Sequence, residues 1–199
     1  MPHIDYYLST ISPAVYIAGT RMEAVAAKHG ATITYKPVDL RSLFTQTGGL
    51  PPNERHPNRQ AYRLQDLTRQ AAKQSLPFNP QPMHFPTNGA PAAYALIAAQ
   101  KAGGGDLGAL VHTITRAVWA EEKDIAEDSV VRACLAEAGF DPELVNSGML
   151  SGAETYARNA EEAVSAGVFG APFYITDSDQ RFWGQDRIED LELHLAGKL

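Results

Sequence analysis

The chain has 199 residues, of which 44% are hydrophobic and 20% are charged, the composition of an ordinary folded protein with a sizeable core. Its formal net charge of -6, with scattered lysines and arginines, argues against a nucleic-acid partner. The longest apolar stretch, residues 90–99, is too short to span a membrane, and the first residues lack the pattern of a signal peptide. We therefore expect a cytoplasmic protein without nucleic-acid or membrane partners.

The single cysteine argues against disulfide or dithiol chemistry, and the spacing of the histidines argues against a metal site. Cys134 falls on the apolar stripe of a predicted helix, so we expect it in the core, and one cysteine permits neither an intrachain disulfide nor a dithiol site. The six histidines do not show the spacing of metal ligands. No metal site is expected.

The chain opens with a strand that runs into a helix. Ile4, Tyr6 and Leu8 alternate along the strand, and the spacing becomes helical after Pro13. Ser12 suits the N-cap position and Pro13 the first helical position, so free backbone N–H groups and the positive end of the helix dipole meet a hydroxyl there. An anion would be stabilised at this junction, although Ser-Pro is also a common way simply to begin a helix.

The next elements complete a β-α-β unit. Residues 13–29 have the periodicity of one amphipathic helix with Gly30 as its stop, and residues 32–38 are rich in β-branched side chains typical of a strand. A right-handed crossover makes the two strands parallel and puts Ser12 at the carboxyl end of the first strand, where ligands of α/β sheets usually bind.

The middle of the chain changes character. Residues 39–57 read as a loop, and helices are predicted over residues 58–74, 89–103, 107–121, 128–138, 142–149 and 151–166. Asn88 could cap the second of these helices, and Ser151 with Glu154 has the spacing of a capping box for the last.

The α/β pattern then resumes with a strand at 173–176, a hairpin partner at 181–186 and a final helix at 187–196 capped by Asp186. The order predicts an α/β protein with a thioredoxin-like core (residues 1–40 and 167–199, four strands) and a helical insertion (residues 41–166). In such a core Ser12 faces Pro172, the proline before the third strand.

Six stretches in the same order resemble one family over nearly the whole chain. They are the strand followed by Ser12-Pro13, P-x-R-x-x-Y-x-x-x-D-L at 57–67, F-P-T-N at 85–88, W-A-E-E-K-D-I at 119–125, G-V-F-G-A-P at 167–172 and F-W-G-Q-D-R at 182–187. Together they resemble the 2-hydroxychromene-2-carboxylate isomerases, which are related to kappa-class glutathione transferases and, more distantly, to DsbA-like disulfide oxidoreductases.

The resemblance implies glutathione as cofactor. It implies that Ser12 hydrogen-bonds the glutathione sulfur and that Ala171, before a cis Pro172, pairs its backbone with the cysteinyl portion. It further implies that Gln185 and Asp186 hold the γ-glutamyl end and that Arg59 reaches the other end. Taken singly, Asp186 could be only a helix cap, Arg59 a solvated charge and Pro172 an ordinary trans proline.

Physical chemistry agrees with these roles. A thiol reacts as its thiolate, and a hydroxyl donor together with a helix N-terminus favours that anion. A cis peptide would turn backbone N–H and C=O groups outward, where a peptide ligand could pair with them as an extra strand. Two departures from the family pattern, Ala14 and Val15, predict a roomier and drier pocket. A third, Gly49, stands where the family usually has an asparagine that contacts glutathione, and it leaves the glutathione affinity and the thiol partner open.

Three functions remain open from the sequence. The first is a glutathione-dependent isomerase in which the thiolate adds reversibly to a small aromatic carboxylate, of the 2-hydroxychromene-2-carboxylate to o-hydroxybenzylidenepyruvate type. The second is a kappa-like glutathione transferase or peroxidase, and the third is a non-catalytic thiol- or peptide-binding module. The family resemblance also predicts a homodimer.

Overall fold

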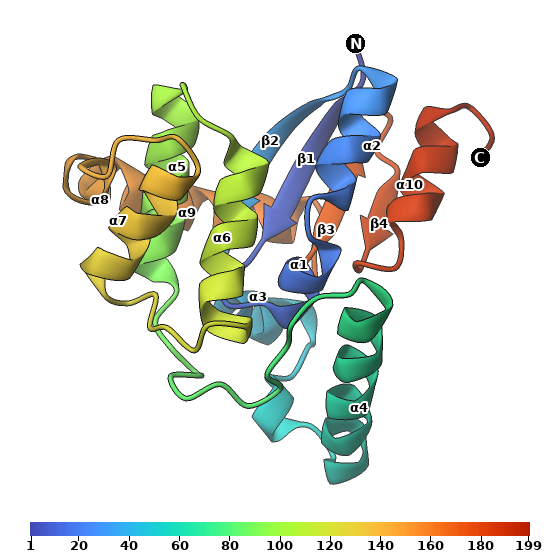
Figure 1. Ribbon diagram of the computed structural model, residues 1–199. Helices are drawn as coiled ribbons and strands as arrows, with labels where there is room; N and C mark the ends of the chain where they lie inside the picture. Colours follow the sequence, from blue (N-terminus) through green and yellow to red (C-terminus); the bar gives the residue numbers. More distant parts are fainter.

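The computed structural model describes residues 1–199 and contains one four-stranded sheet in the order β2-β1-β3-β4 (Figure 1). Its strands are β1 His3–Leu8, β2 Thr32–Pro37, β3 Phe173–Thr176 and β4 Arg181–Trp183. Strands β1 and β2 are parallel, whereas β3 runs antiparallel to both of its neighbours. This confirms the predicted thioredoxin-like α/β fold.

The predicted helix over residues 13–29 is two helices, α1 Pro13–Ala18 and α2 Arg21–His29. The prediction of one helix was wrong because Gly19 has φ 59° and ψ -135°, a conformation that ends α1 and that glycine tolerates without a steric penalty. The apolar periodicity continues across this break, so the pattern did not reveal it.

A helix, α3 Leu40–Thr47, lies where a loop was predicted. The Asp39 carboxylate accepts a hydrogen bond from Arg41 N at 2.9 Å at its start, and Gly48 ends it with φ 78°. A short 3-10 helix, η1 Pro52–Glu54, follows. The Gly48-Gly49 pair therefore follows the end of α3, and the Pro51-Pro52 pair begins η1.

The other helices agree with the sequence within a few residues. They are α4 Pro57–Lys73, α5 Ala90–Ala102, α6 Leu107–Trp119, α7 Asp128–Glu137, α8 Leu144–Ser147, α9 Met149–Ser165 and α10 Ile188–Leu195. Two predicted caps are wrong. Helix α9 begins before Ser151, whose hydroxyl donates to Gly148 O at 3.4 Å, and α10 begins at Ile188 without a side-chain cap from Asp186.

The main core is continuous between the sheet and the inserted helices. Tyr6 and Tyr174, from β1 and β3, belong to the same buried cluster as Ile114 and Trp119 of α6. On the other face of the sheet, a smaller cluster joins Phe173 and its neighbours to α3 and α9. No helix of the chain has the length and apolar character needed to cross a membrane.

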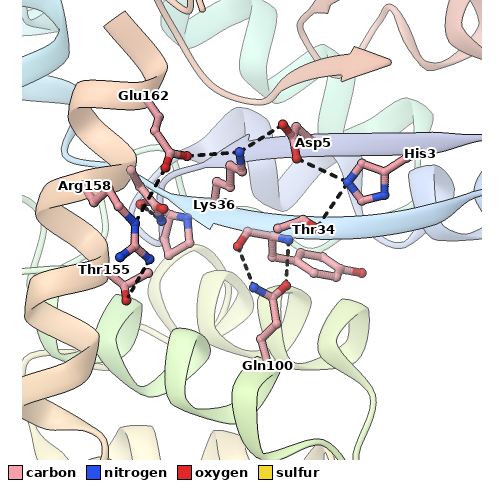
Figure 2. Close-up of polar contacts among 11 residues, drawn as sticks. His3, Asp5, Thr34, Lys36, Gln100, Thr155, Arg158 and Glu162 are labelled. Carbon is pink, nitrogen blue, oxygen red and sulfur yellow. Dashed lines mark hydrogen bonds and ion pairs between the residues drawn. The ribbon is translucent and has the colours of Figure 1, made fainter. Parts of the chain in front are cut away.

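Polar side chains fasten the outer edge of the sheet to the insertion (Figure 2). The Gln100 side chain of α5 accepts from Tyr35 N at 2.7 Å and donates to Tyr35 O at 3.1 Å, which satisfies edge groups of β2. Lys36 Nζ lies 2.9 Å from an Asp5 oxygen and 3.1 Å from a Glu162 oxygen. Both sides of β2 are therefore tied to helices.

Candidate functional site

Ser12 begins α1 and faces the segment that precedes β3. Its Oγ accepts a hydrogen bond from Val15 N at 3.3 Å, so Ser12 is the N-cap, and it donates to Ala171 O at 3.4 Å. Both bonds are long, and the side chain belongs to a residue that is only 5% exposed. The Ser12 hydroxyl thus donates only a weak hydrogen bond to Ala171 O, and a stronger acceptor on a ligand could replace that carbonyl.

The Ala171-Pro172 peptide bond is cis, as the sequence predicted. Pro172 is held from the other side, because its carbonyl accepts from Gly184 N at 2.9 Å. Ala171 is partly exposed and its N–H donates to no group of the protein. A backbone donor is therefore free beside the Ser12 hydroxyl, while the nearby carbonyl of Ala171 accepts only a long bond.

A second loop lies against the Ser12 junction, and sequence reasoning did not find it. Thr10 Oγ1 donates to Gly89 O at 2.9 Å, and a Cβ on Gly89 would come within 2.5 Å of Thr10 Oγ1 and 2.9 Å of Ile11 Cγ2. Only glycine fits this approach. The Asn88 side chain accepts from Ala90 N at 3.1 Å, but the N-cap of α5 is Gly89, so Asn88 lies one position before the cap that the sequence predicted it to be.

Gln185 and Asp186 follow β4. The Gln185 carbonyl accepts from Arg21 Nη2 at 3.0 Å, which ties this turn to the start of α2. Asp186 Oδ2 pairs with Arg187 Nη2 at 2.9 Å, and both side chains are about half exposed (49% and 51%). The Asp186 carboxylate therefore has room for a second cation, and it is free of the capping role that the sequence gave it.

Arg59 is not in contact with these residues. It lies exposed in the first turn of α4 and forms no ion pair or hydrogen bond through its guanidinium. Figure 1 shows that this end of α4 projects away from the sheet. The structure thus brings Ser12, Ala171 and Pro172 together and leaves Arg59 apart from them.

The three residues that depart from the family pattern have different surroundings in the structure. Val15 is 1% exposed and packs in the main core. A Cβ on Gly49 would lie 2.8 Å from Phe44 Cδ1, so a larger residue at position 49 requires Phe44 to move. Ala14, in contrast, is partly exposed.

The chain's own thiol does not belong to the site. Cys134 of α7 is buried, and desolvation together with Glu137 and Glu121 raises the pKa of its thiol to about 11. Such a thiol stays protonated and unreactive near neutral pH. The chain therefore supplies no reactive thiol of its own.

Comparison with known proteins defines the class. A family model described as a DSBA-like thioredoxin domain matches residues 3–196. A solved structure of a 2-hydroxychromene-2-carboxylate isomerase superposes with a TM-score of 0.78 at 23% identity, covering 98% of this chain and 95% of the other. The fold is that of a DsbA-like thioredoxin-domain protein.

Curated relatives narrow the class. The chain is 30% identical to 2-hydroxychromene-2-carboxylate isomerase of Sphingobium xenophagum over 96% of its own length and 97% of the relative's. It is 28% identical to glutathione S-transferase kappa 1 of Caenorhabditis elegans over 94% and 88% of the two lengths. The chain belongs to the 2-hydroxychromene-2-carboxylate isomerase family, and it is an isomerase.

Proposed function

We propose that the protein is a glutathione-dependent isomerase of a small aromatic carboxylate, interconverting a 2-hydroxychromene-2-carboxylate and an o-hydroxybenzylidenepyruvate. The observation that carries this proposal is the convergence of the Ser12 hydroxyl with the free backbone N–H of Ala171 at a cis proline. The kappa-class relative, named for glutathione, supports the choice of thiol.

The residues present fit glutathione. Ala171 offers an unpaired N–H and a weakly engaged carbonyl, the two groups that an extended peptide needs to pair as an additional strand. Asp186 offers a half-exposed carboxylate for an ammonium, and Gln185 an amide side chain without a partner in the protein. We propose that these groups hold the cysteinyl and γ-glutamyl portions, and Arg59 the far end.

Bound glutathione supplies a thiolate that can add reversibly to an electrophilic carbon and leave again. The chain's part is to orient it and to keep it deprotonated. Ser12 donates a hydroxyl proton toward the sulfur, and the Ala14 N–H at the start of α1 has no partner in the protein and lies close by in sequence. Both donors favour the anion and thereby lower the thiol pKa.

The decisive experiment follows substrate, product and thiol together. Absorbance reports conversion of 2-hydroxychromene-2-carboxylate, and a thiol assay reports glutathione in the same reaction. We expect turnover that requires glutathione in catalytic amounts and consumes none. Turnover at an undiminished rate without any thiol would refute the proposed cofactor.

The kappa-class relative favours a second candidate, a glutathione transferase or peroxidase. In that case the sulfur stays on the product or becomes oxidised, so glutathione disappears in proportion to substrate. The same two measurements distinguish the two activities.

We further propose a cytoplasmic homodimer in which residues 1–40 and 167–199 form the core and residues 41–166 the insertion. The cytoplasm is where glutathione keeps thiols reduced. Light scattering at micromolar concentration tests the oligomeric state, and a monomer there would contradict it.

A further inference from the structure

Three arginines lie together at the beginning of α4 without any carboxylate partner. Arg55 precedes the helix, and Arg59 and Arg63 are one helical turn apart on it, so they share a face. None of them forms an ion pair, whereas Arg116, Arg132 and Arg187 elsewhere in the chain each pair with a glutamate or aspartate. An uncompensated cationic group is unusual in a protein with a net charge of -6.

The position of Arg55 is fixed by its surroundings. Its Nε donates to Leu50 O at 2.8 Å, and its guanidinium lies 5.6 Å from the centre of the Phe44 ring of α3. Gln60 of α4 donates to Arg55 O at 2.7 Å, which holds the loop against the helix. The remaining guanidinium nitrogens of Arg55 are free to bind a ligand.

Arg63 lies on the inner side of α4. Leu67 and Ala71, four and eight residues further on, are buried in the main core, so the stripe that contains Arg63 faces the body of the protein. Arg63 is half-buried and yet its guanidinium has no hydrogen-bond partner in the protein. Burial and the nearby charge of Arg55 lower its pKa, and burial and Arg59 lower that of Arg55. An anion would relieve both penalties.

Helix α4 contacts α1 near the carboxyl end of α4. Gln74 and Leu76, just after α4, line a cavity of about 200 Å³ together with the end of α1, and Tyr16 Oη donates to Pro77 O at 2.6 Å. Figure 1 shows the carboxyl end of α4 near α1, with the rest of α4 below α1 in this view. Helix α4 has 17 residues against 6 in α1, so α4 is roughly 16 Å longer than α1.

This arrangement sets how far Arg63 is from the reactive end. Arg63 is one helical turn, about 6 Å, before Leu67, the first residue of α4 that is buried in the core shared with α1. A ligand with its reacting group at Ser12 can therefore place an anionic group near Arg63.

We propose that Arg55 and Arg63 form a carboxylate-binding site for the ligand whose reacting group lies at Ser12, an inference that rests on the proposed function. Guanidinium groups bind carboxylates through paired, charge-assisted hydrogen bonds, so two of them facing one carboxylate give a site with a preferred direction. The carboxylate is either that of the glutathione glycine, which these two arginines would then hold together with Arg59, or that of the aromatic 2-oxo acid.

Titration calorimetry with four probes tests this site. The probes are glutathione, its glycine monoethyl ester, 2-oxo-4-phenylbut-3-enoate and the methyl ester of that acid, each with wild type, Arg63→Gln and Arg63→Lys. Arg69→Gln is the matched control, because Arg69 is on the same helix but pairs with Asp66 at 3.6 Å. Arg55→Gln, in the loop before α4, serves if Arg63→Gln does not fold.

We expect Arg63→Gln to weaken one acid by about tenfold or more and to leave its ester unchanged, so that the preference for the acid disappears. If the preference for glutathione over its ester is lost, the site binds the glycine carboxylate of glutathione. If the preference for the oxo acid over its ester is lost, the site binds the carboxylate of the substrate. Arg63→Lys should keep part of the preference, and Arg69→Gln all of it.

Equal weakening of an acid and its ester, or no change in either pair, overturns the proposed site. If wild type itself binds neither glutathione nor the oxo acid, the proposed function fails instead, and the two failures are thereby distinguishable.

Discussion

Replacing Ser12 by alanine separates a catalytic hydroxyl from a helix cap. The change removes one oxygen that accepts from Val15 N at 3.3 Å and donates to Ala171 O at 3.4 Å. Alanine fills the remaining space, so no cavity opens. Loss of the cap should lower the free energy of unfolding by about 1 kcal/mol, and the melting temperature by roughly 2–4 °C for a protein of this size.

The effect on bound glutathione follows from the donor that is lost. One hydrogen bond to a thiolate contributes about 1.4 kcal/mol, which raises the pKa of the bound thiol by about one unit. A raised pKa leaves less thiolate at neutral pH, so turnover should fall most there and recover partly as the pH increases. Binding through Ala171 and Asp186 should persist.

Ultraviolet titration of the thiolate, alongside thermal melting, gives both quantities. Ser9→Ala is the matched control, since Ser9 is equally buried at 4% exposure and its hydroxyl makes no hydrogen bond in the protein. It should leave the thiolate titration unchanged. If Ser12→Ala also titrates as wild type and only its melting temperature drops, Ser12 is a cap and the catalytic assignment is wrong.

Three further changes test separate parts of the structure. Asp186→Ala should weaken glutathione binding by about 1–3 kcal/mol through a lost charge-assisted bond, and an unchanged dissociation constant in calorimetry would leave Asp186 only its exposed pair with Arg187. Burial raises the pKa of Glu23, so its contribution to stability is present below the ordinary glutamate pKa and is lost as the pH rises through the folded value. Glu23→Gln should therefore flatten the pH dependence of urea unfolding above about pH 4, and an unchanged pH dependence contradicts this. Gly152→Ala should lower the free energy of unfolding by about 1–3 kcal/mol, because its Cβ would lie 2.7 Å from Tyr94 Cβ and 2.9 Å from Tyr94 O, and wild-type stability in urea would refute that contact.

Local patterns were enough to predict the strands and the meeting of Ser12 with Pro172. Alternation of apolar residues indicates the first strand and β-branched residues the second, and the Ser-Pro pair marks the helix start whatever packs around it. Once β-α-β and β-β-α halves are recognised, chain topology brings the start of α1 and the segment before β3 together. The resemblance to the family then supplied the expectation of a cis bond at Pro172.

Other elements had a signal that was overlooked. Helix α3 begins after Asp39, has Leu40, Leu43 and Phe44 at helical spacing and ends at Gly48. The Gly-Gly and Pro-Pro pairs that follow it outweighed this pattern. The break at Gly19 is different, because glycine inside a helical pattern is compatible with either a continuous helix or a bend.

Contacts between distant segments left no signal in the sequence. Thr10 and Gly89 are 79 residues apart, and neither lies in a pattern that predicts their hydrogen bond. The groups that Arg63 faces likewise depend on how α4 packs against α1, because helical spacing indicates which stripe faces inward but not what it packs against. Asp186 was misassigned for a related reason: the turn after β4 continues to Arg187 before α10 begins.

The residues at the Ser12 junction and the arginines at the start of α4 come from different parts of the chain, and this affects ligand specificity. Ser12 and Ala171 belong to the strands and helix of the core, whereas Arg55 and Arg63 belong to the segment inserted after β2. The position of Arg63 relative to Ser12 depends on the packing of Leu67 and Ala71 beneath α4, and these side chains share the main core with the sheet. A change in the length or angle of α4 would therefore shift the carboxylate site without disturbing the hydroxyl at Ser12. On the proposed function, the fold keeps the reacting group fixed while the insertion sets which carboxylate ligand reaches it.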